Sequence, residues 1–211
     1  MKKTFFTSDW HIGHEKALEY DQRPFKDLDH MHRVLVNNYN ACVSNDDICY
    51  FLGDIGFSNT ETTKGVISQL NGTRVCILGN HDKGKNAMYS MGFDLVLSSA
   101  SFHVGDDLVT MSHCPLRGVF RELTEGMKNA AVQENWHGER RHSKFSIPDN
   151  GQFHLHGHIH SGPANEKLKI DGRQMDVGVP ANKYRPVSMS EIESWIAKYK
   201  KDLLETILLI S

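Results

Sequence analysis

The chain has 211 residues, enough to bury an apolar core without disulfides or other cross-links. Its 24 Lys and Arg residues nearly balance 26 Asp and Glu residues, and a formal net charge of −2 provides no global attraction to nucleic acid or to an acidic membrane surface. None of the four cysteines belongs to a CxxC pair, so we expect free thiols in a reducing compartment. The apolar N-terminal run ends at Ser8-Asp9, and no long apolar segment follows. We therefore expect a cytoplasmic protein without a membrane partner.

Short apolar runs alternate with helical patterns in the first half of the chain. Three buried strands are predicted, at residues 4–7, 48–52 and 75–78. Apolar spacing predicts a helix from about Leu28 to Tyr39, and a capping box at Ser58 and Glu61 predicts another that ends near Leu70. Three β-then-α units in succession favour a parallel α/β arrangement.

Polar residues follow each of these strands. Asp9 and His11 follow the first, Gly53-Asp54 follows the second, and Gly79-Asn80-His81-Asp82 follows the third. Ligands bind at the carboxyl ends of the strands in such sheets, so we expect these side chains to share one site. Turn and cap residues could explain any one of these strand ends, but not three that all carry metal- or proton-binding groups.

The second half is predicted to form hairpins and a final helix. Strands at 95–104 and 108–111 are joined at Gly105-Asp106-Asp107, and the second leads to His113. A further hairpin is predicted over 167–179 around Asp171-Gly172, and Ser188 with Glu191 forms a capping box for the last helix. That helix carries an apolar stripe that we expect to be core, formed by Ile192, Trp195, Ile196, Tyr199, Leu203 and Ile207.

We expect a single domain over residues 1–211, with residues 116–151 as an insert on the substrate side. The insert is polar, lacks clear periodicity and contains several basic residues that could contact a negatively charged substrate. A solvated loop with one short helix is an equally good interpretation. The basic residues considered are Arg117, Arg121, Arg140, Arg141 and Lys144.

Residues 152–160 contain four histidines at alternate positions, His154, His156, His158 and His160. One continuous strand would place all four on one face, and Phe153, Leu155 and Ile159 on the other. Each buried imidazole needs a hydrogen-bond partner or a metal, so a purely packing role is costly. Solvated histidines on an edge strand are the alternative, and the polar strand ends elsewhere in the chain weaken it.

Collected in order, these motifs resemble the calcineurin-like metallophosphoesterase superfamily. The segments 8–14 and 184–187 are similar to those of small single-domain bacterial and phage phosphoesterases in it. The chain departs from the family pattern at Gly56, which comes directly after the Gly53-Asp54 motif. The resemblance implies an α/β (α+β) fold in which two packed β-sheets are flanked by helices as a four-layer sandwich. The motifs are Asp9-x-His11, Gly53-Asp54, Gly79-Asn80-His81-Asp82, His113 and Gly157-His158-x-His160.

The resemblance also implies a centre of two divalent metal ions. Mixed oxygen and imidazole ligands suit transition metals, and we expect Mn²⁺, with Fe²⁺, Zn²⁺ and Ni²⁺ as alternatives. The ligands carried over are Asp9, His11 and His160 for one ion, Asn80, His113 and His158 for the other, and Asp54 as the bridge between them.

The activity implied is metal-dependent hydrolysis of a phosphate ester. Two divalent ions can lower the pKa of a bridging water, whose hydroxide attacks phosphorus in line. His81 is not needed as a ligand, so we expect it to protonate the leaving oxygen. Asp82 either orients His81 or has a structural role. The substrate contacts expected are Asn80, Arg117, Arg140 and Arg141.

We favour small phosphodiesters of the nucleotide type as substrates. The alternatives are a DNA or RNA nuclease, which the weak basicity of the insert does not favour, a phosphomonoesterase, and a non-catalytic scaffold, which could dispense with His81. His156 is expected to support the ligands, and the other histidines to be structural. If the insert does not determine specificity, the surroundings of His14 and Arg23 are the next place to look.

Overall fold

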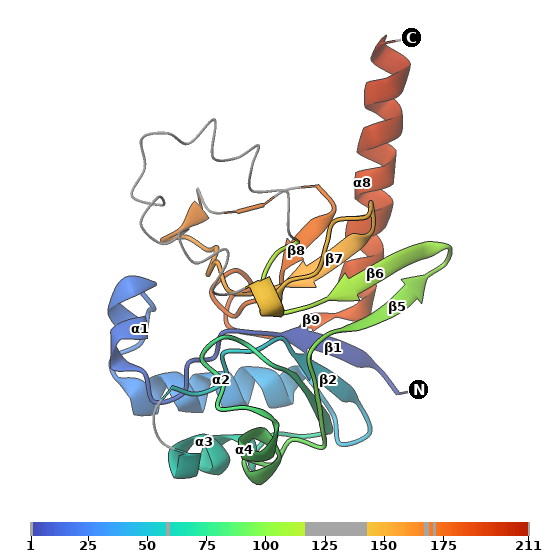
Figure 1. Cartoon of the computed structure of the whole chain (residues 1–211). Coiled ribbons are helices and arrows are strands. Elements are labelled where there is room, and N and C mark those ends of the chain that lie inside the picture. Colours follow the sequence, from blue (N-terminus) through green and yellow to red (C-terminus); the bar gives the residue numbers. More distant parts are fainter. Residues whose placement is uncertain (1, 58–59, 117–142, 167–168, 171, 211) are drawn as a thin grey trace.

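Successive side chains of a central sheet point into two different cores. In β1 (Thr4–Thr7), Phe5 packs with one apolar cluster and Phe6 with another. β2 (Ile48–Phe51) repeats the pattern, since Phe51 joins the first cluster and Tyr50 packs against the second. This alternation is the expected period of two. The computed structural model describes residues 2–57, 60–116, 143–166, 169–170 and 172–210 (Figure 1).

Two mixed sheets make up the framework. The first has the order β4-β3-β2-β1-β9; β1 to β4 are parallel, and β9 pairs antiparallel with β1. The second has the order β5-β6-β7-β8, in which β5 and β6 form an antiparallel hairpin and β7 and β8 continue in parallel. The remaining strands are β3 (Thr73–Ile77), β4 (Leu95–Leu97), β5 (Ala100–Val104), β6 (Asp107–Met111), β7 (Phe153–His156), β8 (Gln174–Asp176) and β9 (Val187–Ser188).

The helices lie outside the sheets. Figure 1 shows α2, α3 and α4 on one side of the five-stranded sheet and the four-stranded sheet on its other side. Within the described part of the chain, no helix has both the length and the apolarity needed to cross a membrane. The helices are α1 (Glu15–Tyr20), α2 (Leu28–Cys42), α3 (Thr60–Ile67), α4 (Lys85–Ser90), the 3-10 helix η1 (Ser143–Phe145) and α8 (Met189–Ile210).

Two cores hold these layers together. The first lies between the five-stranded sheet and the helices, where Leu35 and Tyr39 of α2 pack with Ile67 of α3. The second lies between the two sheets, where Leu52 and Ile77 meet residues of β6, β7 and α8, among them Leu155 and Ile192. The predicted fold class, two sheets flanked by helices, is confirmed, as are the parallel β1–β3 core and the β5–β6 hairpin.

Three predictions about strands are wrong. The run 95–104 is split at Ser98-Ser99 into β4 and β5, which belong to different sheets. The strand predicted through His160 ends at His156 as β7. The segment 167–179 contributes β8, which pairs in parallel with β7 and forms no hairpin among its described residues. The short helices α1 and α4 were not predicted.

The capping box of α8 is present, and the predicted apolar stripe is only partly core. Ser188 N–H donates to Glu191 Oε2 (2.9 Å), and Glu191 N–H donates to Ser188 Oγ (3.3 Å). Ile192 is buried in the second core. Leu203 and Ile207 are 47% and 53% exposed because, as Figure 1 shows, the last turns of α8 extend beyond both sheets. The capping box predicted at Ser58 lies outside the described residues.

Candidate metal centre

Backbone pairing between β1 and β2 continues beyond both strands and holds the first candidate ligands together. Asp9 N–H donates to Gly53 O (3.1 Å), and His11 N–H donates to Asp54 O (3.0 Å). The register of a parallel strand pair thus extends into two loops. Asp54 comes 43 residues after His11 in the sequence. Asp9, His11 and Asp54 nevertheless lie at one edge of the sheet, as the sequence predicted.

Five of the seven predicted ligands have a left-handed backbone, although none is glycine. Their φ angles are 59° for Asp9, 49° for His11, 54° for Asp54, 71° for His158 and 48° for His160. Non-glycine residues adopt this conformation uncommonly, and it costs about 1–3 kcal/mol each. Such strain is concentrated at functional sites, so its coincidence with the predicted ligands supports a shared role.

One group of four side chains brings its ligand atoms within 4.8 Å of one another: Asp9, His11, Asp54 and His160. His160 Nε2 lies 2.9 Å from His11 Nε2 and 3.4 Å from Asp9 Oδ1. Asp54 Oδ2 is 3.8 Å from His11 Nε2. Carboxylate oxygens and imidazole nitrogens in this arrangement are a suitable donor set for a divalent transition metal.

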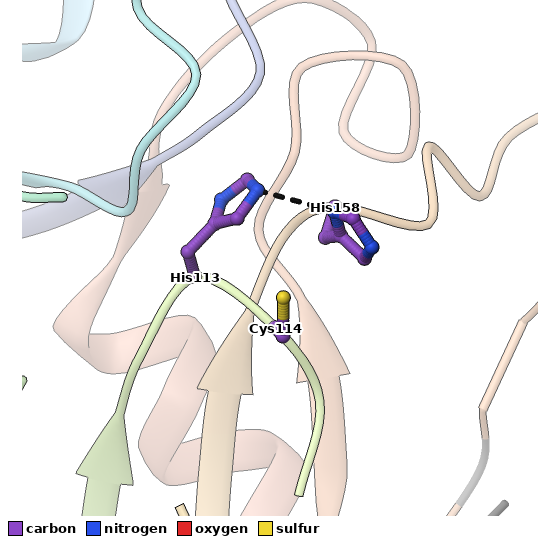
Figure 2. Close-up of side chains that lie close together, drawn as sticks. All are labelled: His113, Cys114 and His158. Carbon is purple, nitrogen blue, oxygen red and sulfur yellow. Dashed lines mark hydrogen bonds between the residues drawn. The ribbon is translucent and has the colours of Figure 1, made fainter. Parts of the chain in front are cut away.

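A second group converges on His113. Its Nε2 lies 2.8 Å from Asn80 Oδ1, 3.2 Å from His158 Nδ1 and 3.4 Å from Asp54 Oδ1. His113, Cys114 and His158 also have ligand atoms within 4.8 Å of one another. Figure 2 shows the Cys114 sulfur directed toward the space between His113 and His158.

Asp54 lies between the two groups. Its Oδ2 faces His11 of the first group and its Oδ1 faces His113 of the second. The side chain is 2% exposed, so its two oxygens are directed by the protein rather than by solvent. A carboxylate that presents one oxygen to each of two donor groups has the geometry of a bridging ligand.

Asp54 and Asp9 each face a histidine whose pKa they raise. Burial raises the pKa of Asp9, but the hydrogen bond and charge of His160 bring it below its ordinary value. Burial also raises the pKa of Asp54, and the charge and hydrogen bond of His113 bring it below its ordinary value. Burial lowers the pKa of both histidines, yet the carboxylates facing them raise it to about 10 for His160 and about 9 for His113. The buried anions therefore need nearby positive charge, which metal ions can supply.

The other two imidazoles are held neutral. Burial, then the charge of His160, lowers the pKa of His11 to about 3, and burial, then the charge of His113, lowers that of His158 to about 3. Neutral imidazole is the form that binds metals. Among the residues that the structure describes, His11 Nδ1 is also buried and has no hydrogen-bond partner. These features fit divalent ions bound among the four histidines.

Two of the candidate ligand histidines are fixed through their other ring nitrogen. His113 Nδ1–H donates to Leu52 O (2.7 Å), and His160 Nδ1–H donates to Asp21 Oδ1 (2.9 Å). Each bond leaves Nε2 facing the centre, which is the arrangement typical of metal-binding histidines. Asp21 is held in turn by Arg23, whose Nε and Nη2 donate to Asp21 Oδ2 (2.9 and 2.8 Å).

His81 and Asp82 have different surroundings. The His81 side chain is exposed, its ring lies 6.0 Å from that of His11, and its N–H donates to Asp54 Oδ1 (3.0 Å). Asp82 instead accepts hydrogen bonds from the N–H groups of Gly79 (2.7 Å), Asp54 (3.1 Å) and Ile55 (3.0 Å). No hydrogen bond joins it to His81 among the described residues. Asp82 therefore holds together two loops that carry candidate ligands, which corresponds to the structural alternative.

Sequence reasoning missed Cys114 and Asp21. Cys114 directly follows the predicted ligand His113, whereas Asp21 belongs to no strand-end motif and only the fold brings it to the centre. His154 and His156 were expected on the ligand face but are buried: His154 Nδ1 lies 3.0 Å from Thr110 Oγ1, and His156 Nδ1–H donates to Gly157 O (2.9 Å). The predicted substrate contacts Arg117, Arg140 and Arg141 lie outside the described residues.

No family model matches the chain. The Gene 66 protein of Mycobacterium phage L5 is 31% identical to it over 201 residues, which cover 86% of this chain and 88% of the phage protein. The protein of unknown function AQ665 from Aquifex aeolicus has the same fold, with a TM-score of 0.63 and 23% identity over 92% of this chain and 99% of that one. The phosphoesterase Yfce from E. coli gives a TM-score of 0.35 at 12% identity over 85% of this chain and 79% of that one, a likeness too low to carry an argument.

Proposed function

The chain belongs to the same family as the Gene 66 protein of Mycobacterium phage L5, and because that name states no activity, we propose a function from the candidate metal centre. The proposal is a calcineurin-like metallophosphoesterase that uses two divalent metal ions, Mn²⁺ by preference, to hydrolyse small phosphodiesters of the nucleotide type. The observation that carries it is Asp54, whose two oxygens face two separate groups of metal-binding side chains.

The proposed residues have two roles, to hold the metal ions and to orient the histidines that bind them. Asp9, His11 and His160 would hold one ion, and Asn80, His113 and His158 the other. When bound, two ions would activate a water molecule and neutralise the charge of the phosphoryl group. Asp21 and the carbonyl of Leu52 keep the Nε2 atoms of His160 and His113 directed at the centre.

His81 is the proposed proton donor to the leaving oxygen. Its ring borders the first group of ligands and is open to solvent. Its N–H is anchored on the proposed bridging carboxylate (3.0 Å), which fixes the start of the side chain relative to the centre. A group placed at the edge of the site, rather than among the ligands, can approach a substrate without giving up a metal contact.

Metal content and hydrolysis test the proposal together. The wild-type protein should bind two Mn²⁺ per chain and hydrolyse bis(p-nitrophenyl) phosphate, lose this activity on chelation and regain it with Mn²⁺. Asp54→Ala removes an oxygen from both groups and should abolish hydrolysis and leave at most one ion per chain. Asp106→Ala, an exposed carboxylate in the β5–β6 turn, is the control and should change neither. Full activity of a protein shown to be metal-free would refute the proposal.

A further inference from the structure

A groove of about 490 Å³ adjoins the candidate metal centre at the start of α1. Its lining includes His14, Lys16, Tyr20 and Phe57. His14 is three residues beyond the proposed ligand His11, and Phe57 is three residues beyond the proposed bridge Asp54. The same two loops therefore carry both the ligands and the groove.

Aromatic rings connect the groove to the centre. The rings of His14 and Phe57 are stacked, with centroids 3.9 Å apart and planes at 18°. The ring of His14 is 5.7 Å from that of His11, and the ring of Phe57 is 5.4 Å from that of His81. We call the rings of His14, Phe57 and Tyr20 the aromatic platform.

The backbone fixes the position of the aromatic platform. Ile12 N–H donates to Ile55 O (2.9 Å), and Phe57 N–H donates to Ile12 O (3.1 Å), which continues the parallel pairing up to the stacked rings. Gly56 leaves no room for a side chain, because a Cβ there would collide with Thr63 of α3. The backbone hydrogen bonds that continue the β1–β2 pairing thus position Phe57 next to the centre, as they position the candidate ligands.

Two members of the aromatic platform are exposed to solvent at a hydrophobic cost. Phe57 is 41% exposed and Tyr20 is 67% exposed. Exposed apolar surface that borders a polar site is characteristic of ligand-binding surfaces. Aromatic faces bind planar rings by stacking, and Lys16 and Glu15 on the same groove offer polar partners to the edge of such a ring.

We propose that the aromatic platform binds a planar ring carried by the leaving group, so that the substrates are phosphate esters of nucleosides or of similar ring-bearing alcohols. The inference rests on the proposed function: a phosphoryl group at the metal centre places its leaving oxygen beside His81, and Phe57 is the aromatic ring next to His81 on the groove side. Ring stacking then orients the ester for attack, as binding energy remote from the reacting bond can do.

Calorimetry of the Mn²⁺-loaded protein with two probes tests the inference. Adenosine 5′-monophosphate and ribose 5-phosphate share the phosphate and the sugar and differ in the base. Base stacking is worth about 1–3 kcal/mol, so we expect adenosine monophosphate to bind at least about fivefold more tightly. Phe57→Leu keeps an apolar side chain without a ring and should bring the two affinities close together. His14→Ala is the second variant and should reduce the same ratio.

The control is Tyr89→Leu, which removes a comparably exposed ring (46%) from α4 and should leave the ratio unchanged. Equal affinities in the wild-type protein, or a ratio unchanged in both Phe57→Leu and His14→Ala, would overturn the inference. Binding of neither probe by a protein that hydrolyses bis(p-nitrophenyl) phosphate would overturn it as well. Failure of the proposed function would give a different result: the wild-type protein would bind no Mn²⁺ or would hydrolyse no ester.

Discussion

At the level of single residues, the candidate centre is built from side chains that suit both a left-handed backbone and a metal ion. Asp and His are among the non-glycine residues enriched in that conformation, and both bind divalent ions. The five left-handed positions in the centre are all Asp or His. The backbone strain of these positions, about 1–3 kcal/mol each, has to be offset by the cores and by the hydrogen bonds that hold the loops.

The role of His81 is tested by leaving-group dependence. His81→Ala should lower kcat for an ester with a poor leaving group by about 10²–10⁴-fold, since a positioned acid contributes that much. The loss should be much smaller for a nitrophenyl ester, whose leaving group barely needs a proton. Mn²⁺ content should stay near two per chain, because His81 is not among the proposed ligands. Equal losses on both esters would instead assign His81 to phosphate binding.

Asp21 is expected to act through His160 rather than on the substrate. Asp21→Asn removes the anionic acceptor of His160 Nδ1–H and the partner of the buried Arg23, so Mn²⁺ affinity should fall about 10–100-fold. Saturating Mn²⁺ should restore most of kcat, and Asp21→Glu should restore part of the affinity. Asp94→Asn, which loses a half-exposed pair with Arg74, is the control and should leave Mn²⁺ binding unchanged. Unchanged Mn²⁺ binding in Asp21→Asn would show that His160 needs no such support.

At the level of elements, the parallel βα units, the β5–β6 hairpin and the α8 cap were predictable because local patterns determine them. The approach of Asp9 to His158 was not predictable from local patterns. It depends on the loop after β7, where Gly157 allows close contact between chain segments. The alternating histidines predicted a longer strand because spacing alone does not reveal where left-handed residues end it. Arg23 and Asp21 carried no spacing signal, and their role became visible only through contacts between distant segments.

Gly157 is predicted to be required because no side chain fits at this position, rather than because glycine has a flexible backbone. A Cβ at this position would collide with Ser8 Oγ and Asp9 Oδ2, so Gly157→Ala should displace a proposed ligand and weaken Mn²⁺ binding at least about tenfold, or about 1.4 kcal/mol. Gly65→Ala in α3 meets no atom within 4 Å and is the matched control. It should raise the free energy of unfolding by about 0.5–1 kcal/mol and leave Mn²⁺ binding unchanged. Calorimetric titration and urea denaturation measure both effects.

The capping box of α8 should give a pH-dependent contribution to stability. Hydrogen bonding to Arg185 (2.7 Å) and Ser188 lowers the pKa of Glu191 from 4.5 to about 2. A lowered folded-state pKa stabilises the protein above the unfolded value, and this contribution disappears as the pH falls from about 4.5 to about 2. Glu191→Gln should therefore cost less than about 1 kcal/mol at pH 7, because the pair is partly exposed, and less still at pH 3.

Urea denaturation of the wild-type protein and Glu191→Gln at pH 7 and pH 3 measures this difference. Glu205→Gln, which removes an exposed i,i+4 partner of Lys201 (3.7 Å), is the control and should have a smaller effect at pH 7. A stability difference between the wild-type protein and Glu191→Gln that stays constant from pH 7 to pH 3 would contradict an ionic contribution from Glu191.

At the level of the whole molecule, the candidate centre combines loops from the two sheets that the second core packs together. Its proposed ligands come from loops after β1, β2 and β3 of one sheet and after β6 and β7 of the other. Metal ions bound there would link the two sheets, and the unfolded chain has no such preformed site. Ligands that bind only the folded state stabilise it by mass action, by about 2.7 kcal/mol at a concentration 100 times Kd.

Mn²⁺ should accordingly raise the melting temperature. For a chain of about 200 residues, 1 kcal/mol corresponds to about 2–4 °C, so a shift of about 5–10 °C is expected for one tightly bound ion and more for two. Differential scanning fluorimetry with EDTA and with increasing Mn²⁺ measures it. Asp54→Ala should lose most of the shift, because it weakens both groups of ligands at once, whereas His81→Ala should retain it. A shift of the same size in Asp54→Ala and in the wild-type protein would mean that Mn²⁺ stabilises the fold from somewhere other than between the two sheets.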